Sequence, residues 1–344
     1  MAVIVMTDDG IRFDAASLAT GPLGGAETAF ASLAAALAGR GHRIVVRNNC
    51  SEASDTDGID WAPLAAGVPE AADLYIANRS HKLISLVAEA RRRVFWIHNP
   101  ASYLMKRRYL WPLFRLKPTV VFSGRYHAST YPLWAPSGPR AIIPYGVGEM
   151  FRQAEPLDLA PGPRALFVSN PLRGLDWLLH LWAKRIHPVM PLAELHVFSG
   201  PTTYGSFGLA KAQAMEPILE YARQLGNWGV VLRAPVSKTM LADEMRSTRV
   251  LLYRGDPSET FCLAVAEAQA AGVPAVVGRL GSVPERVIDG TTGFVTDRET
   301  SFAEAAVTLL QDDELWRRQH VAALLTQRHW GWDEAAAAFE RLIP

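Results

Sequence analysis

The sequence predicts an α/β protein made of two domains, each a doubly wound, Rossmann-like parallel sheet. The chain has 344 residues, more than a single hydrophobic core usually supports. Short β-rich runs alternate with helical patterns along the whole chain, which is typical of βαβ units with parallel strands. With 49% hydrophobic and 20% charged residues, the composition excludes a disordered or fibrous protein.

The expected strands divide into two series separated by a segment that interrupts regular structure. We predict strands at residues 3–6, 44–46, 74–77, 94–97, 120–122 and 141–143, and then at 165–168, 195–198, 230–232, 250–253 and 275–277. Residues 155–164 contain three prolines and a glycine, which break both helix and strand. We therefore place the linker there, between domains at 1–155 and 156–325.

Composition and the chain's first residues exclude several classes of protein. Residues 1–6 carry no basic leader, and no apolar run approaches the roughly 18 residues that cross a bilayer. A net charge of +1 does not suggest a nucleic-acid partner. Cys50 and Cys262 lie far apart in sequence and form no metal-ligand cluster. We expect a cytoplasmic protein, with any membrane contact peripheral.

The most informative segment runs from Glu259 to Glu267, directly after the predicted strand 250–253. If a helix begins near Phe261, its free N–H groups favour a diphosphate. Eight helical steps would separate the two carboxylates by roughly 12 Å, so that Glu267 accepts the hydroxyls of a ribose while Glu259 lies beside a sugar. The plain alternative is a helix-start charge at Glu259 and a solvated Glu267.

Residues 257–277 and 282–295 closely resemble the C-terminal signature of glycosyltransferase family four. Its hallmark is two glutamates separated by seven residues, followed by a small-Gly-x-Pro-x-Val strand. The resemblance implies a GT-B fold, with two Rossmann-like domains facing a central cleft and a helix in 326–344 packing back on the first domain. It also implies a metal-independent, retaining glycosyltransferase that needs no cofactor besides its nucleotide-diphosphate sugar.

The same resemblance assigns roles to the residues of this segment. It implies that Glu259 contacts the transferred sugar and that Glu267 holds the nucleotide ribose. Backbone amides that contact the phosphates and the sugar are expected at Thr260, Phe261, Cys262 and Leu263.

A second loop, after the predicted strand 165–168, is expected to bind the donor diphosphate. Family members carry an Arg and then a Lys before Gly at this place. Here Arg173 occupies the place of the Lys, whereas Ser169 or Asn170 stands where the Arg would be. Arginine can bind phosphate bidentately, and Arg254 is a candidate second cation. A helix-start charge remains the alternative for Arg173, and a surface cation for Arg254.

Two loops of the first domain supply further candidates. Gly24 and Gly25 open the helical pattern that follows the first strand, and paired glycines let a backbone approach a ligand closely. By resemblance, this turn approaches the donor and the acceptor. His98 follows the predicted strand 94–97, where family members place a histidine that contacts the donor sugar. A plain glycine turn and a structural histidine are the alternatives.

Other motifs are set aside or left open. Asp55 and Asp57 resemble an Asp-x-Asp metal site, but they lie in a polar run rather than at the end of an apolar strand, so we expect no metal there. No Gly-x-Gly-x-x-Gly follows a strand and no Gly-Lys-Ser/Thr phosphate loop occurs, which disfavours dinucleotide oxidoreductases and nucleoside triphosphatases. The stretch from Lys106 to Lys117 mixes cations with aromatics, as either a membrane-contacting surface or a solvated helix would.

The expected function is transfer of a sugar from a nucleotide sugar to a glycan or lipid-linked acceptor. Cell-surface polysaccharide, lipopolysaccharide or glycolipid synthesis fits such a hexosyltransferase. The alternatives are a nucleotide-sugar epimerase or glycoside phosphorylase on the same fold, and a non-catalytic nucleotide-sugar-binding subunit. The non-catalytic subunit gains support because Ser169 or Asn170 stands where family members carry an Arg.

Overall fold

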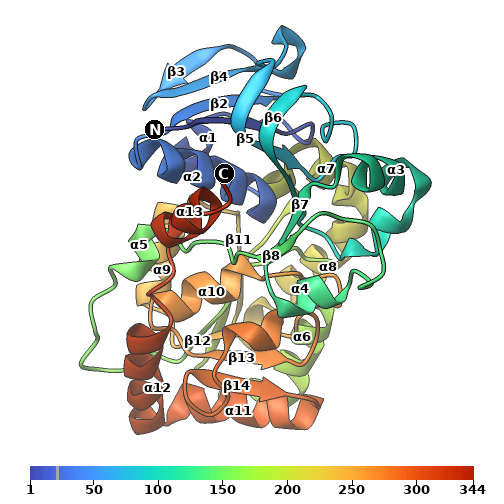
Figure 1. The fold of residues 1–344 in the computed structure, drawn as a ribbon. Coiled ribbons are helices and arrows are strands. Elements are labelled where there is room, and N and C mark those ends of the chain that lie inside the picture. The colour runs from blue at the N-terminus through green and yellow to red at the C-terminus, as the bar shows by residue number, and fades with distance from the viewer. Residues whose placement is uncertain (21–22) are drawn as a thin grey trace. The chain divides into compact units, whose positions relative to one another are not determined.

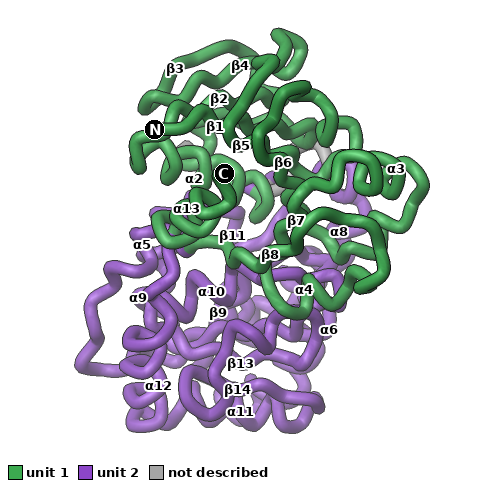
Figure 2. The backbone as a smooth tube through the Cα atoms, in the orientation of Figure 1, with its two compact units in different colours: residues 1–18, 24–146, 332–344 green, residues 19–23, 147–331 purple. Residues whose placement is uncertain are grey.

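A computed structural model describes residues 1–20 and 23–344 of the chain, and these residues form two compact units (Figure 2). Unit 1 comprises Met1–Leu18, Gly24–Gly146 and Trp332–Pro344. Unit 2 comprises Val147–Gly331 and the described part of the short segment 19–23. Each unit has its own sheet, so the chain builds two hydrophobic cores.

Unit 1 contains an eight-stranded sheet in the order β3-β4-β2-β1-β5-β6-β7-β8 (Figure 1). All neighbours are parallel except the edge pair of β3 and β4, which is antiparallel. The strands are β1 (Val3–Thr7), β2 (Arg43–Asn48), β3 (Ser54–Thr56), β4 (Ile59–Pro63), β5 (Ala71–Asn78), β6 (Glu89–Trp96), β7 (Thr119–Phe122) and β8 (Arg140–Ile142). The helices of this region are α1 (Ser17–Thr20), α2 (Gly25–Gly39), α3 (Arg107–Leu116), α4 (Arg125–Ser129) and α13 (Trp332–Glu340).

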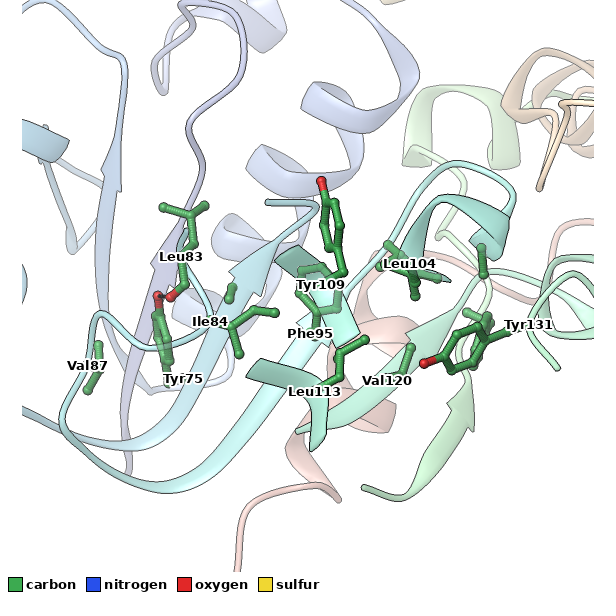
Figure 3. Packing of buried hydrophobic residues seen from close by; sticks show 14 of the residues in the cluster. Tyr75, Leu83, Ile84, Val87, Phe95, Leu104, Tyr109, Leu113, Val120 and Tyr131 are labelled. Carbon is green, nitrogen blue, oxygen red and sulfur yellow. Dashed lines mark hydrogen bonds between the residues drawn. The ribbon is translucent and has the colours of Figure 1, made fainter. Parts of the chain in front are cut away.

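The central strands of unit 1 are apolar on both faces because helices or loops cover both sides of the sheet. Ile4, Val5 and Met6 of β1 are fully buried. On one side, Phe95 and Val120 of the sheet pack with Tyr109 and Leu113 of α3 in a single hydrophobic cluster (Figure 3). This cluster holds α3 through one of its faces only.

Unit 2 contains a six-stranded parallel sheet in the order β11-β10-β9-β12-β13-β14. The strands are β9 (Arg164–Phe167), β10 (Glu194–Phe198), β11 (Val230–Arg233), β12 (Val250–Tyr253), β13 (Ala275–Gly278) and β14 (Gly293–Thr296). The helices are α5 (Glu149–Arg152), α6 (Leu175–Leu181), α7 (Gly205–Ala210), α8 (Ala212–Gln224), α9 (Lys238–Arg246), α10 (Leu263–Ala270), α11 (Glu299–Gln311) and α12 (Asp313–Thr326). Residues of β12 and β13 are almost completely buried, as expected for central parallel strands.

Apart from the described part of the segment 19–23, which groups with unit 2, the chain changes units at two neighbouring points rather than in the predicted linker. Unit 1 gives way to unit 2 between Gly146 and Val147, and unit 2 returns to unit 1 between Gly331 and Trp332. Val147 and Gly331 form a parallel bridge, so the two passages lie side by side. The proline-rich segment 155–164 lies within unit 2, which corrects the predicted linker position. Those prolines separate α5 from β9 instead.

All eleven predicted strands are present, but the structure adds three strands that were not predicted. Two of them, β3 and β4, form an edge hairpin whose turn places Asp57 and Gly58 at φ +54° and +77°. An Asp-Gly turn with two positive φ values is the strongest short hairpin signal, and it was hidden in a polar run. The third is β14, which continues the sheet beside β13.

Candidate functional site

The candidate site of unit 2 lies where the order of its sheet reverses. From β9 the chain proceeds outward through β10 to β11, whereas from β12 it proceeds through β13 to β14 on the other side. The loops that follow β9 and β12 therefore leave neighbouring strands in opposite directions, and open α/β sheets bind ligands at such a point. Arg173 belongs to the first loop and Glu259 to the second.

The structure brings Arg173 and Glu259 into direct contact. Nη1 of Arg173 donates to Oε1 of Glu259, and the hydroxyl of Tyr253 donates to the same oxygen at 2.9 Å. The Glu259 side chain is 9% exposed, whereas that of Arg173 is 36% exposed. The buried Glu259 carboxylate thus accepts hydrogen bonds from the buried Tyr253 hydroxyl and from the partly exposed Arg173 guanidinium. Both residues were predicted, but their contact was not.

Ser169 lies beside this pair but supplies no charge. Its side chain hydrogen-bonds Tyr253, whose pKa is raised by burial and by the neighbouring Glu259 carboxylate. The Asn170 side chain stabilises its own loop, because its Oδ1 accepts a hydrogen bond from the backbone N–H of Leu172 at 2.9 Å. Both residues at the place of the family's first Arg therefore act as neutral loop residues. Arg173 is the cation of this loop.

Helix α10 begins at Leu263, two residues later than predicted. Cys262 precedes it in the left-handed region at φ +67°, and the backbone N–H of Val265 hydrogen-bonds the Cys262 thiol. Burial and the Glu259 carboxylate raise the pKa of that thiol well above its usual value. The thiol is therefore neutral. The amides of Leu263 and Ala264 lack an acceptor within the helix, so an anion can bind there.

The late start of α10 also changes the expected geometry of the two glutamates. Glu259 lies in a turn in which its own N–H donates to the carbonyl of Asp256 at 2.9 Å. Only Glu267 lies on the helix, so the predicted axial separation of roughly 12 Å, which assumed continuous helix, does not apply. Thr260 and Phe261 lie between the two glutamates in this non-helical stretch and are buried.

Glu267 has a partner that the sequence did not reveal. Nζ of Lys238, the first residue of α9, lies 2.7 and 2.8 Å from the two carboxylate oxygens. Burial raises the pKa of Glu267, and the charge and hydrogen bond of Lys238 partly offset this rise. The carboxylate is 3% exposed, so the alternative of a solvated glutamate is wrong. A ligand hydroxyl that binds Glu267 would share it with Lys238.

A second cation that was not predicted, Arg286, lies near the start of α10. Its Cζ stands 4.4 Å from the centre of the Phe261 ring, and burial lowers the pKa of its guanidinium. Its Nε is buried and has no hydrogen-bond partner among the described residues. Its one ion pair there is a long contact to Glu285 at 3.4 Å. A poorly neutralised cation thus lies close to the positive end of a helix dipole.

Arg254, the predicted compensating cation, lies elsewhere on the loop after β12. Its guanidinium carbon is 5.2 Å from the centre of the Trp177 ring on α6. Trp177 in turn donates its indole N–H to Glu299 at 2.7 Å. Arg254 is exposed, and its side chain also lies beside Gly174, the residue that follows Arg173.

Unit 1 carries a buried polar network at the corresponding reversal of its own sheet, between β1 and β5. Asp8, after β1, accepts Nε and Nη2 of Arg79 at 2.9 and 3.0 Å. Arg79 also pairs with Glu27 of α2 at 2.8 Å. Asp8 is fully buried and Glu27 is 6% exposed. Glu27 is therefore a buried ion-pair partner rather than the simple first-turn charge of a helix.

His98 belongs to this network. Its Nε2 lies 2.5 Å from Oδ1 of Asn78, and its Nδ1 contacts the Tyr145 hydroxyl. Burial, and then the charge of Arg79, lower the pKa of His98 well below its usual value. Because an amide oxygen only accepts hydrogen bonds, Nε2 of the neutral ring donates and Nδ1 accepts from Tyr145. A contact between His98 and a donor sugar would have to replace or share these bonds.

The predicted glycine pair opens α2. Gly24 caps the helix in an extended conformation, and a Cβ added at Gly25 would meet no described atom within 4 Å. The backbone of α2 is therefore open at Gly25, whereas Gly24 is buried. Gly21 and Pro22, which precede this pair in the predicted turn, lie outside the described residues.

The structure describes no metal-binding cluster. Within residues 1–20 and 23–344, no group of three His, Cys, Asp or Glu side chains is arranged to hold a metal ion. Asp55 lies on the edge strand β3 and Asp57 in the hairpin turn that follows it. In the same part of the chain, no helix is long and apolar enough to span a membrane.

Comparisons with known proteins support the family over part of the chain. Residues 162–312 match the family model described as Glycosyl transferases group 1. D-inositol 3-phosphate glycosyltransferase of Streptomyces scabiei (strain 87.22) is 38% identical over 175 residues, which cover 49% of this chain and 38% of that protein. The matched region is thus well under half of that relative's length.

Solved structures extend the similarity of fold to nearly the whole chain. Sucrose-phosphate synthase from Thermosynechococcus elongatus has a TM-score of 0.77 at 16% identity, covering 99% of this chain and 98% of that chain. Anabaena HepE in complex with UDP-glucose has a TM-score of 0.73 at 16% identity, covering 99% of each chain. The predicted fold class, α/β of the GT-B type with two Rossmann-like units, is confirmed.

Proposed function

We propose that the protein is a glycosyltransferase that moves a sugar from a nucleotide-diphosphate donor to a glycan or lipid-linked acceptor. The observation that carries the proposal is the set of groups at the reversal point of the unit 2 sheet. There, the Arg173–Glu259 pair lies on the loops that lead into α6 and α10, within the region that matches the family model. The HepE structure, which shares the fold, holds UDP-glucose.

In this proposal, unit 2 binds the donor. The free amides at Leu263 and Ala264 and the guanidinium of Arg173 bind the diphosphate, because partial and full positive charges converge on an anion there. Glu267 accepts the ribose hydroxyls, and Glu259 contacts the transferred sugar. The loop formed by Thr260, Phe261 and Cys262 supplies further backbone contacts. Unit 1, with Gly24, Gly25 and His98, serves the acceptor and the sugar.

The proposed reaction retains the configuration of the anomeric carbon. The bond from that carbon to the β-phosphate oxygen breaks, and a bond to the acceptor oxygen forms on the same face. The proton of the acceptor hydroxyl passes to the departing diphosphate. Catalysis is then mainly electrostatic, because Arg173 and the α10 amides stabilise negative charge that develops on the leaving group.

Arg173 has to exchange partners during this reaction. In the structure its Nη1 donates to Glu259, whereas the proposal requires it to face the diphosphate. Its side chain is 36% exposed, so the guanidinium can rotate toward a ligand without leaving a buried pocket. Tyr253 keeps one hydrogen bond on Glu259 when Arg173 turns away.

The proposal is tested by substitution of the two central residues. Glu259→Ala and Arg173→Ala should each lower turnover by ~100-fold or more if these residues act on charge that develops in the transition state. Release of nucleoside diphosphate and transfer to a glycan acceptor are measured together. Near-normal rates in both variants would remove these residues from the mechanism.

The same assay separates the alternatives. Conversion of a nucleotide sugar without an acceptor would identify an epimerase, and sugar phosphate formed from glycan and phosphate would identify a phosphorylase. The neutral Ser169 and Asn170 in the phosphate-binding loop favour a non-catalytic subunit as the second candidate. Tight donor binding with neither transfer nor hydrolysis would support that subunit and contradict the transferase.

A further inference from the structure

Helix α3 of unit 1 presents a face that combines unpaired cations with large exposed aromatics. Within residues 90–148 the chain has ten Lys or Arg residues and no Asp or Glu. Half of these cations fall at or beside α3: Lys106, Arg107, Arg108, Arg115 and Lys117. Among the described residues, no carboxylate forms an ion pair with any of the five. The surface around α3 therefore carries an excess of positive charge.

The two faces of α3 are sharply divided. Tyr109 and Leu113 point into the hydrophobic cluster of unit 1 (Figure 3). Trp111 and Phe114 point the other way and are 66% and 64% exposed. Residues three and four apart share one face of a helix, so these two aromatics lie with Arg107 and Arg115 along a single exposed stripe.

This stripe is not explained by solvation alone. A solvated helix face carries polar groups, whereas exposing two aromatic rings to water is unfavourable. The apolar loop after α4 adds to the same pattern. Leu133 and Trp134 are 94% and 76% exposed, while Arg140 donates to the carbonyls of Pro132 and Ala135 at 2.8 and 2.9 Å. A loop whose carbonyls are held by the Arg140 side chain thus presents its apolar side chains to solvent.

We propose that α3 is a membrane-binding helix, which lies in the interface of a bilayer that contains anionic lipids. Trp and Phe side chains favour the interface, and surrounding Lys and Arg are attracted to anionic headgroups. Trp111 and Phe114 insert, and Arg107, Arg108 and Arg115 bind phosphates. The proposal does not depend on the proposed sugar transfer, because binding to vesicles is measured without any substrate.

The test is sedimentation of the full chain with lipid vesicles. Binding is expected to vesicles of phosphatidylglycerol mixed with phosphatidylcholine, weak binding to phosphatidylcholine alone, and a loss of binding at high salt. Trp111→Ser with Phe114→Ser, and separately Arg107→Glu with Arg115→Glu, should each lower vesicle binding by about tenfold or more. Trp111→Phe should retain most of it.

Matched controls lie on α12 of unit 2. Arg317→Glu with Arg318→Glu makes the same change in charge on another exposed helix and should leave vesicle binding unaltered. Thermal unfolding of each variant should match that of the original chain, because all four α3 positions are exposed. Equal binding by the α3 and α12 variants would overturn the proposal. So would binding of a single-stranded oligonucleotide by the α3 stripe with no binding to anionic vesicles.

Discussion

Each glutamate of the candidate site is held by a cation, Glu259 by Arg173 and Glu267 by Lys238. Glu259 and Glu267 stand in a recognisable pattern, and Arg173 follows a predicted strand. Lys238 could not be found in this way, because it lies 29 residues from Glu267 and only the fold brings them together. Arg286 was hidden for a related reason, since its partner ring, Phe261, belongs to a different loop.

Lys238 provides a test of how the second glutamate is held. Lys238→Met leaves Glu267 buried without its cation and should lower the free energy of unfolding by about 2–3 kcal/mol near pH 8. This loss is taken at the low end of the range for a broken buried ion pair because the Lys238 side chain is 22% exposed. Denaturant unfolding measures the loss, and the double variant Lys238→Met with Glu267→Gln should recover most of it.

The pH dependence of this loss has a definite sign. Burial raises the pKa of Glu267 in the folded state, and removing Lys238 raises it further. A carboxyl with a raised folded-state pKa costs stability when ionised, and this cost disappears as the pH falls through that pKa. The difference between Lys238→Met and the original chain should therefore shrink on going from pH 8 toward pH 5. A difference that is constant or grows would show that Glu267 is not the cause.

At the scale of elements, prediction succeeded for the central strands but missed β3, β4 and β14 and misplaced the start of α10. Runs such as Val250–Tyr253 are apolar because both faces of the sheet are covered, and that pattern is visible in one sequence. The edge strand β3 is short, polar and exposed, so it carries no such signal. The start of α10 was misplaced because Cys262 adopts a positive φ. A cysteine in the sequence does not predict this conformation.

Helix α13 returns to unit 1 and is fixed there by apolar and ionic contacts. Phe339 is 1% exposed, and its ring centre lies 5.1 Å from that of Trp96 on β6. Arg40, at the end of α2, pairs with Glu340 at 2.6 Å and with Asp333 at 2.9 Å. The last helix therefore closes the core of a unit whose other elements lie more than 180 residues earlier.

Removal of the Phe339 ring should thus destabilise unit 1. Phe339→Ala is expected to cost about 3–5 kcal/mol, because it empties a packed position beside Trp96. Hydrogen exchange of the β6 amides reports on this unit separately from unit 2. Phe114→Ala is the matched control, since this ring of the same unit is 64% exposed and should cost no more than about 0.5 kcal/mol. Equal effects of the two changes would contradict the placement of α13.

At the scale of the whole molecule, chain length and the repeated βαβ pattern were sufficient to predict two units of one fold class. The position of the linker was not, because, apart from the segment 19–23, the chain passes between units at Val147 and again at Gly331. Prolines mark a break in regular structure but not a boundary between cores. Which loops meet at each reversal point also depends on strand order, which one sequence does not reveal.

The central claim is that the reversal point of the unit 2 sheet binds a nucleotide-diphosphate sugar. A thermal-shift screen of UDP-, GDP- and ADP-sugars identifies the ligand that stabilises the folded chain, and the most direct measurement is a crystal structure with that ligand bound. The account predicts the diphosphate at the amides of Leu263 and Ala264, within reach of Arg173, and the ribose at Glu267. A diphosphate bound instead at the carboxyl edge of the unit 1 sheet would contradict it.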